Sequence, residues 1–166
     1  MAITSLLLII LINIIFQSTI LPYLSLFGHI PNTGLIFVIL VALRKGKYYG
    51  SFFGLALGLI QDILFGQAVG VNALIFFVIG YLIGMIQDVL DVENVVIPIL
   101  SSAICTILYN FSFYTIMFFL SRDIPREVMI KNVFSIEILY NVIFATLIYK
   151  LFSKIFVLPD LRFSKR

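Results

Sequence analysis

The sequence predicts an all-α integral membrane protein, built as a six-helix transmembrane bundle. Two observations predict this fold class: the composition and the spacing of the charged residues. Hydrophobic residues make up 62% of the 166 residues and charged residues only 11%, whereas a soluble domain carries about 25% charged residues. The mean hydropathy is +1.17. This composition excludes a water-soluble enzyme, a nucleic-acid-binding domain and a disordered linker. We therefore expect residues 1–166 to form a single transmembrane domain with no nucleic-acid partner.

Long stretches without charge define the individual helices. The first Asp, Glu, Lys or Arg is Arg44, so residues 1–43 are long enough for two crossings, and Pro22 lies near the break between them. Residues 48–87 contain only one charged residue, Asp62, and are divided in the same way. The predicted helices are 3–26, 32–46, 48–65, 71–88, 95–120 and 132–152, followed by a basic tail at 153–166.

The distribution of basic residues predicts the orientation. Six crossings place both ends of the chain on one side. That side would hold eight bases, namely Arg44, Lys45, Lys47, Lys150, Lys154, Arg162, Lys165 and Arg166. The other side would hold three, namely Arg122, Arg126 and Lys131. Because Lys and Arg gather on the cytoplasmic side, we expect both termini to be cytoplasmic. The tail could also bind anionic membrane lipid, or could serve only to set the orientation.

A stripe of glycines marks the third predicted helix. Gly50, Gly54, Gly58, Asp62 and Gly66 recur every four residues and therefore lie on one face of the helix. Small residues at this spacing let a second helix approach closely within a membrane. The four glycines are candidates for helix packing or for partner docking. If they dock a partner, replacing Gly54 or Gly58 with Leu should abolish association and leave membrane insertion intact.

Polar residues are predicted to meet in the outer half of the membrane. The main candidates are Gln61, Asp62, Asn72, Glu137 and Asn141, with Asn13, Gln17, Tyr109 and Asn110 at similar depth. An ionised Asp at the centre of a membrane helix costs about 2.5–3.5 kcal/mol, so Asp62 should face the bundle or a wet cavity. The cluster could form a polar cavity or docking site, or could be interhelical hydrogen bonds that hold the bundle. In the first case, neutralising Asp62 should disturb function more than neutralising Asp91.

A short segment of the sequence is repeated. Residues 54–64 and 80–90 share six of eleven positions, including both Gly-x-x-x-Gly pairs and both Gln-Asp pairs. Inverted repeats are common in transporters. A chance match in a small apolar alphabet is the alternative.

No motif in the sequence indicates catalysis. The chain has one cysteine, Cys105, and one histidine, His29, so neither a disulfide nor a cysteine- or histidine-based metal site is expected. No nucleophile–base pair or phosphate-binding loop is present. We expect no enzymatic activity, no cofactor and no metal. Cys105 is expected to be a small packing residue within its helix.

Several segments together resemble the rod shape-determining protein MreD family. They are Pro31-Asn32, Val41-Ala42-Leu43-Arg44-Lys45-Gly46, the stripe from Gly50 to Asp62, Gly66 with Gly70 and Asn72-Ala73-Leu74, and Glu137 to Asn141. The length, the number of helices and the basic tail also agree. The chain departs from the family at Gln87-Asp88 and Asp91, where family members usually have basic residues.

The resemblance implies a non-enzymatic scaffold of the machinery that elongates the bacterial cell wall. Its expected partners are the bitopic protein MreC and, through it, the glycosyltransferase RodA and a penicillin-binding transpeptidase, with MreB filaments acting indirectly. The implied fold is similar to that of the S-components of energy-coupling-factor vitamin transporters. A small-molecule-binding S-component is therefore the alternative function, and the outer polar cluster fits it equally well.

Overall fold

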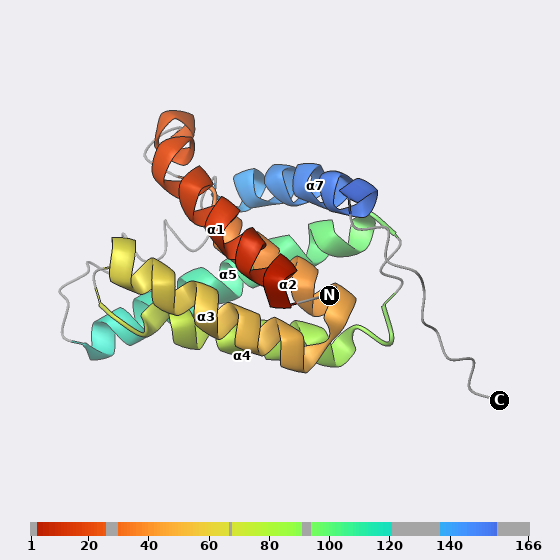
Figure 1. Cartoon of the computed structure of the whole chain (residues 1–166). Coiled ribbons are helices and arrows are strands. Elements are labelled where there is room, and N and C mark those ends of the chain that lie inside the picture. The colour runs from red at the N-terminus through yellow and green to blue at the C-terminus, as the bar shows by residue number, and fades with distance from the viewer. Residues whose placement is uncertain (1–2, 26–29, 67, 91–93, 121–136, 156–166) are drawn as a thin grey trace.

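A computed structural model describes residues 3–25, 30–66, 68–90, 94–120 and 137–155 of the chain. Over these residues the fold is all-helical (Figure 1). The six α-helices and one short 3-10 helix are α1 Ile3–Thr19, η1 Leu21–Leu24, α2 Thr33–Lys45, α3 Lys47–Phe65, α4 Val71–Ile86, α5 Val96–Phe119 and α7 Glu137–Ile155. The predicted all-α class with six helices is confirmed over the described part of the chain. His29, Asp91, Glu93 and the predicted tail beyond residue 155 lie outside it.

The first helix differs from its predicted extent. It was expected to reach residue 26, but α1 ends at Thr19 and the chain continues into η1. Pro22 lies in the first turn of η1. Proline has no backbone N–H and clashes with the preceding helical turn, so the α-helical ladder ends before it. The next four helices end within two residues of the predicted limits. The last helix, α7, extends to Ile155 and so includes the first residues of the predicted tail, whereas residues 132–136 lie outside the described residues.

Among the described residues, two helices are long and apolar enough to cross a membrane by length and composition. These are α3 and α5, while α1 and α4 are apolar but shorter. Many large apolar side chains on the described helices are exposed, among them Leu11, Ile63 and Phe111, each more than half exposed. Contact of such a surface with water is unfavourable, whereas contact with lipid chains is favourable. Six crossings by this bundle remain a prediction.

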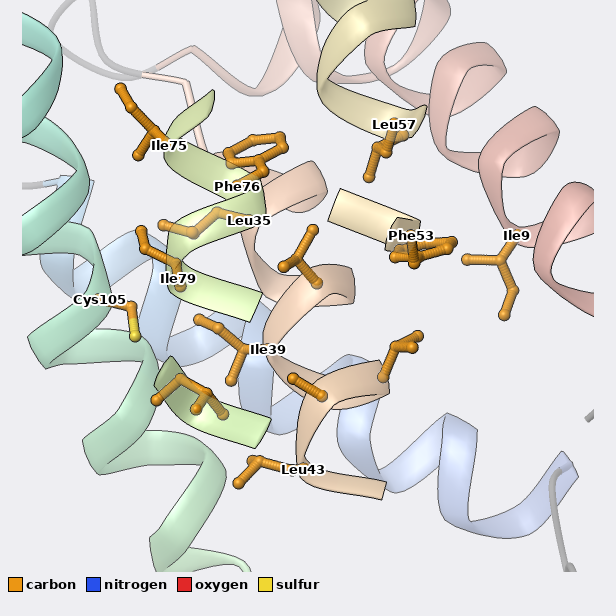
Figure 2. Close-up of a cluster of buried hydrophobic side chains, with 14 of the residues drawn as sticks. Ile9, Leu35, Ile39, Leu43, Phe53, Leu57, Ile75, Phe76, Ile79 and Cys105 are labelled. Atoms are coloured by element: carbon orange, nitrogen blue, oxygen red, sulfur yellow. The ribbon is translucent and has the colours of Figure 1, made fainter. Parts of the chain in front are cut away.

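The short helix α2 lies at the centre of the bundle. Every residue from Thr33 to Leu43 is buried except Phe37, as expected for a helix that is apolar on all sides. Figure 2 shows Leu35, Ile39 and Leu43 of α2 surrounded by side chains from the neighbouring helices. Cys105 of α5 points into this core and is buried, which confirms its expected packing role.

A sharp elbow joins α2 to α3. Gly46 is the only residue between the two helices and has φ 86°, a conformation that residues with a side chain rarely adopt. From the elbow, α3 runs the length of the bundle and α4 returns beside it (Figure 1). The start of α1 and the end of α7 lie at the same end of the bundle as the elbow (Figure 1).

Candidate functional site

At the end of the bundle away from the elbow, α3 ends and α4 and α7 begin (Figure 1). Polar side chains gather here. All six α-helices contribute to this polar layer, together with Asn32, the residue before α2. The layer consists of Asn13, Gln17, Asn32, Thr33, Gln61, Asp62, Asn72, Thr106, Tyr109, Asn110, Glu137 and Asn141. It includes the five main candidates of the predicted outer cluster. Three of its side chains, Asn13, Thr106 and Asn141, are completely buried.

A chain of side-chain amides ties α1 to α2 and α3. The Asn13 Nδ2 donates to Thr33 Oγ1 at 2.8 Å. The Gln61 Nε2 donates to Asn13 Oδ1 at 3.2 Å and to Gln17 Oε1 at 2.5 Å. Gly34 of α2 makes room for this arrangement, because a Cβ there would lie 2.3 Å from Gln61 Nε2. The amide chain therefore depends on the absence of a side chain at residue 34.

The Asp62 carboxylate caps the beginning of α4. It accepts three backbone N–H hydrogen bonds, from Gly70 at 2.9 Å, from Asn72 at 3.1 Å and from Ala73 at 3.1 Å. Gly70, the residue before α4, offers no side chain as a cap. A carboxylate from α3 thus replaces the usual N-cap residue, and its negative charge faces the positive end of the α4 dipole. Asp62 is only 2% exposed, so this interaction is shielded from solvent.

Tyr109 connects this cap to α5. Its hydroxyl donates to Asn72 Oδ1 at 2.6 Å. The Tyr109 ring packs against Phe76 of α4 and stacks on Phe113 of α5, with ring centroids 5.7 and 5.9 Å apart. The hydrogen bond and the ring contacts together fix the position of α4 relative to α5.

Asn141 links α7 to the start of α2 and to α5. Its Oδ1 accepts from the Asn32 backbone N–H at 2.8 Å, and its Nδ2 donates to Thr106 Oγ1 at 2.9 Å. The Asn32 side chain in turn caps α2 by accepting from the Leu35 N–H at 3.0 Å. One turn away, Asn110 Nδ2 donates to Glu137 Oε2 at 3.2 Å.

The polar layer compensates for helix ends that lie inside an apolar bundle. The first N–H groups of a helix have no partner within the helix, and in lipid no water replaces it. Asp62 satisfies such groups for α4, and Asn32 does so for α2. Sequence reasoning missed Asn32, Thr33 and Thr106 as members of the layer. The position of Asn32 directly before an apolar helix is an N-cap signal that could have indicated its role.

The glycine stripe lies against α4 of the same chain. A Cβ on Gly54 would lie 2.5 Å from Phe76 O, and one on Gly58 would lie 2.5 Å from the Ala73 Cα. Gly50 faces Gly80 across the same contact, with a Gly50 Cβ 2.9 Å from Gly80 O. The two backbones touch along this line, which accounts for these three glycines through helix packing within the chain. Gly66 does not belong to the contact.

Gly66 instead ends α3. Its N–H donates to Asp62 O at 3.0 Å, and its backbone is extended. The repeated segments 54–64 and 80–90 place their glycines on the same α3–α4 contact, since a Cβ on Gly84 would lie 2.3 Å from Lys47 N. Their acids are not equivalent. Asp62 is buried as a cap, whereas Asp88 is exposed and accepts from neighbouring Gln87 at 3.4 Å.

A family model described as rod shape-determining protein MreD matches residues 1–156. The chain belongs to the MreD family. This family consists of non-catalytic proteins, and membership implies a role in determining rod shape. Together with the apolar helices α3 and α5, it indicates the cytoplasmic membrane. No curated protein and no solved structure matches the chain, so the expected likeness to transporter S-components stays a prediction.

An aliphatic groove lies between α4 and α5 on the surface of this MreD-family chain. The groove has a volume of about 170 Å³ and is lined by Leu74, Ile75, Val78, Ile79, Leu82, Leu108, Ser112 and Ile116. Ser112 is its only polar residue. A second aliphatic face lies on α1, where Leu7, Leu8, Leu11, Ile12 and Ile15 are each more than half exposed. Within a membrane such surfaces bind lipid chains or other transmembrane helices through shape.

Proposed function

We propose that this chain is a non-enzymatic scaffold of the machinery that elongates the bacterial cell wall, and that it docks MreC within the membrane. Through MreC it supports RodA and a penicillin-binding transpeptidase, and MreB filaments act indirectly. The proposal depends on one observation: the side chains of the polar layer form hydrogen bonds with groups of the same chain. Because these groups bond to one another, the surface that remains for partners on the described helices is mainly aliphatic.

The same pairing argues against the alternative function, a vitamin-binding transport subunit. A polar ligand would require hydrogen-bonding groups that face a cavity. Asp62 accepts three backbone bonds, and Gln61 donates to two neighbouring amides. Among the described residues, the buried side-chain N and O atoms without a partner are Ser102 Oγ and Tyr140 OH, and neither belongs to the polar layer.

We place the docked helix of MreC in the groove between α4 and α5. The glycine stripe is less suitable, because a partner could reach Gly54 and Gly58 only by separating α3 from α4. The groove is concave, and a single partner helix could fill it with side chains. Packing of this kind drives helix association in lipid, where no water is expelled.

The proposed orientation has both termini in the cytoplasm and the polar layer toward the outer surface. The bias of Lys and Arg supports it. The start of α1 and the end of α7 at one end of the bundle are consistent with six crossings (Figure 1). In this orientation the groove extends toward the outer leaflet, on the side where the cell wall is assembled.

A groove-filling substitution tests the docking site. Val78→Trp would fill the groove, whereas Leu11→Trp adds the same ring to the exposed face of α1. Tagged wild-type chain and the Leu11 variant should recover MreC on purification, and the Val78 variant should recover much less. Equal recovery by the Val78 variant would refute the groove. If the wild-type chain retains a vitamin-like ligand and never recovers MreC, the scaffold proposal itself fails.

A further inference from the structure

Positive charge is concentrated at the elbow between α2 and α3, at the end of the bundle away from the polar layer. Arg44 and Lys45 end α2, and Lys47 begins α3 after Gly46 alone. We call these four residues the basic elbow. Because one glycine makes the whole turn, three cations lie within four residues at a single point of the surface. Lys150 of α7 adds a fourth cation at this end, directly after Tyr149.

Tyrosine rings hold two of these cations in place. The Arg44 guanidinium lies over the Tyr149 ring, 5.5 Å from its centroid. The Lys47 ammonium lies 5.4 Å from the Tyr48 ring and 5.9 Å from the Tyr81 ring. Cation–π contacts of this kind fix a charge without neutralising it. Tyrosines also gather where a membrane meets water, which indicates that the elbow lies at headgroup level.

The charge of the elbow is not neutralised within the described residues. In that part of the chain no carboxylate lies within ion-pair distance of Arg44, Lys45 or Lys47. The described acid next to the elbow is Asp88, just beyond the end of α4. The Gln87 side chain lies between Asp88 and the elbow. Its Nε2 donates to Asp88 Oδ1 and lies close to Gly46, where a Cβ would be 3.0 Å away. Within the described residues, one carboxylate against three cations leaves the elbow with an excess of positive charge.

We propose that the basic elbow binds the phosphate headgroup of an anionic phospholipid. The ligand chemistry is a phosphate diester at the membrane surface, which accepts hydrogen bonds from Lys and Arg. Lys45 and Lys47 supply the donors, and the Tyr48 and Tyr81 rings hold Lys47 at the depth of the headgroup. The lipid chains would lie along the adjoining apolar surface of α3, where Phe52 is 64% exposed. This site is independent of the docking groove and of the membrane side on which the elbow lies.

Native mass spectrometry of the full-length chain in detergent, titrated with phosphatidylglycerol or phosphatidylcholine, tests the proposal. The wild-type chain should retain phosphatidylglycerol in preference to phosphatidylcholine. At about 1 kcal/mol for each base near a membrane surface, the double variant Lys45→Gln/Lys47→Gln should bind phosphatidylglycerol about thirtyfold more weakly. The variant Lys45→Arg/Lys47→Arg keeps both charges and should retain the preference.

A matched control removes the same charge elsewhere. Lys165→Gln/Arg166→Gln, at the C-terminal end of the chain, should leave the affinity unchanged. An equal loss in both Gln pairs would mean that only net charge matters, and would overturn the site. Equal retention of the two lipids by the wild-type chain would also overturn it. Displacement of the lipid by millimolar inorganic phosphate would show a site for soluble phosphate instead of a lipid.

Discussion

Replacing Asp62 with Asn tests whether one buried carboxylate holds the beginning of α4 in place. In the structure, Asp62 Oδ2 accepts from Gly70 and Ala73, and Oδ1 accepts from Asn72. Asn has nearly the same shape but only one acceptor oxygen. Its amide group would point N–H donors at a backbone N–H, so at least one of the three bonds is lost.

The expected loss of stability follows from these three bonds. A hydrogen bond to a charged group contributes about 1.5–3 kcal/mol, and one between neutral groups about 0.5–1.5 kcal/mol. At the lower ends of these ranges, losing one charged bond and weakening two others to neutral bonds should lower the free energy of unfolding by about 3.5 kcal/mol. That difference raises the unfolded fraction on the order of a hundredfold.

The chain carries its own reporter for this measurement. Cys105 is the only cysteine in the sequence, and it is 1% exposed beside Ile79 in the core (Figure 2). A thiol-reactive dye should therefore label the protein in detergent only when the packing of α4 and α5 opens. We expect Asp62→Asn to speed the labelling on the order of a hundredfold.

Asp88→Asn is the matched control, because it makes the same chemical change at the equivalent position of the repeated segment. Asp88 is exposed and caps no helix, so its variant should label at the wild-type rate. If the Asp62 and Asp88 variants label equally slowly, the cap contributes nothing to stability and the structural reasoning is wrong.

Three further predictions concern the helix contacts and the role in cell shape. Gly54→Leu should lower the free energy of unfolding by about 3 kcal/mol or more, because its side chain would displace the α4 backbone; Cys105 labelling measures this. Gly34→Ala should displace the Gln61 side chain and loosen α1, which a protease-resistance assay on purified protein would detect as earlier cleavage near the N-terminus. In a complementation assay for rod shape, Asp62→Asn should fail where Asp91→Asn succeeds, and equal outcomes would remove the special role of the acid.

Most helix limits could be predicted because glycine and charge mark them directly in the sequence, whereas the end of α1 was predicted too late although Pro22 marks it. That the polar residues gather at one end of the bundle could be predicted in the same way, by counting residues from the helix ends. The sequence did not reveal which groups these polar side chains form hydrogen bonds with. Asp62 bonds to backbone N–H groups, which are present at every residue and carry no sequence signal. The role of Gly34 depends on a side chain from another helix, and spacing within one helix cannot indicate it.

The partner of the glycine stripe was also open at the level of sequence. The same Gly-x-x-x-Gly spacing serves packing within a chain and docking between chains. A signal was present, because the repeated segment places Gly80 and Gly84 on the next helix, and two antiparallel helices with matching glycines can close on each other. The central position of α2 had a signal as well. Its 13 residues span about 20 Å, less than the hydrocarbon core, and it has no polar face.

The hydrogen bond from Asn32 to Asn141 joins residues 109 positions apart, and this has a consequence for biosynthesis. Domains form in order as the ribosome releases the chain. One flank of α2, around Ile36 and Leu40, is covered by Ala145 and Tyr149 of α7. Until α7 is inserted, that flank lacks the side chains of α7 that pack on it, and the Asn32 N–H lacks the Asn141 acceptor. A nascent chain that stops before α7 therefore leaves the bundle incomplete.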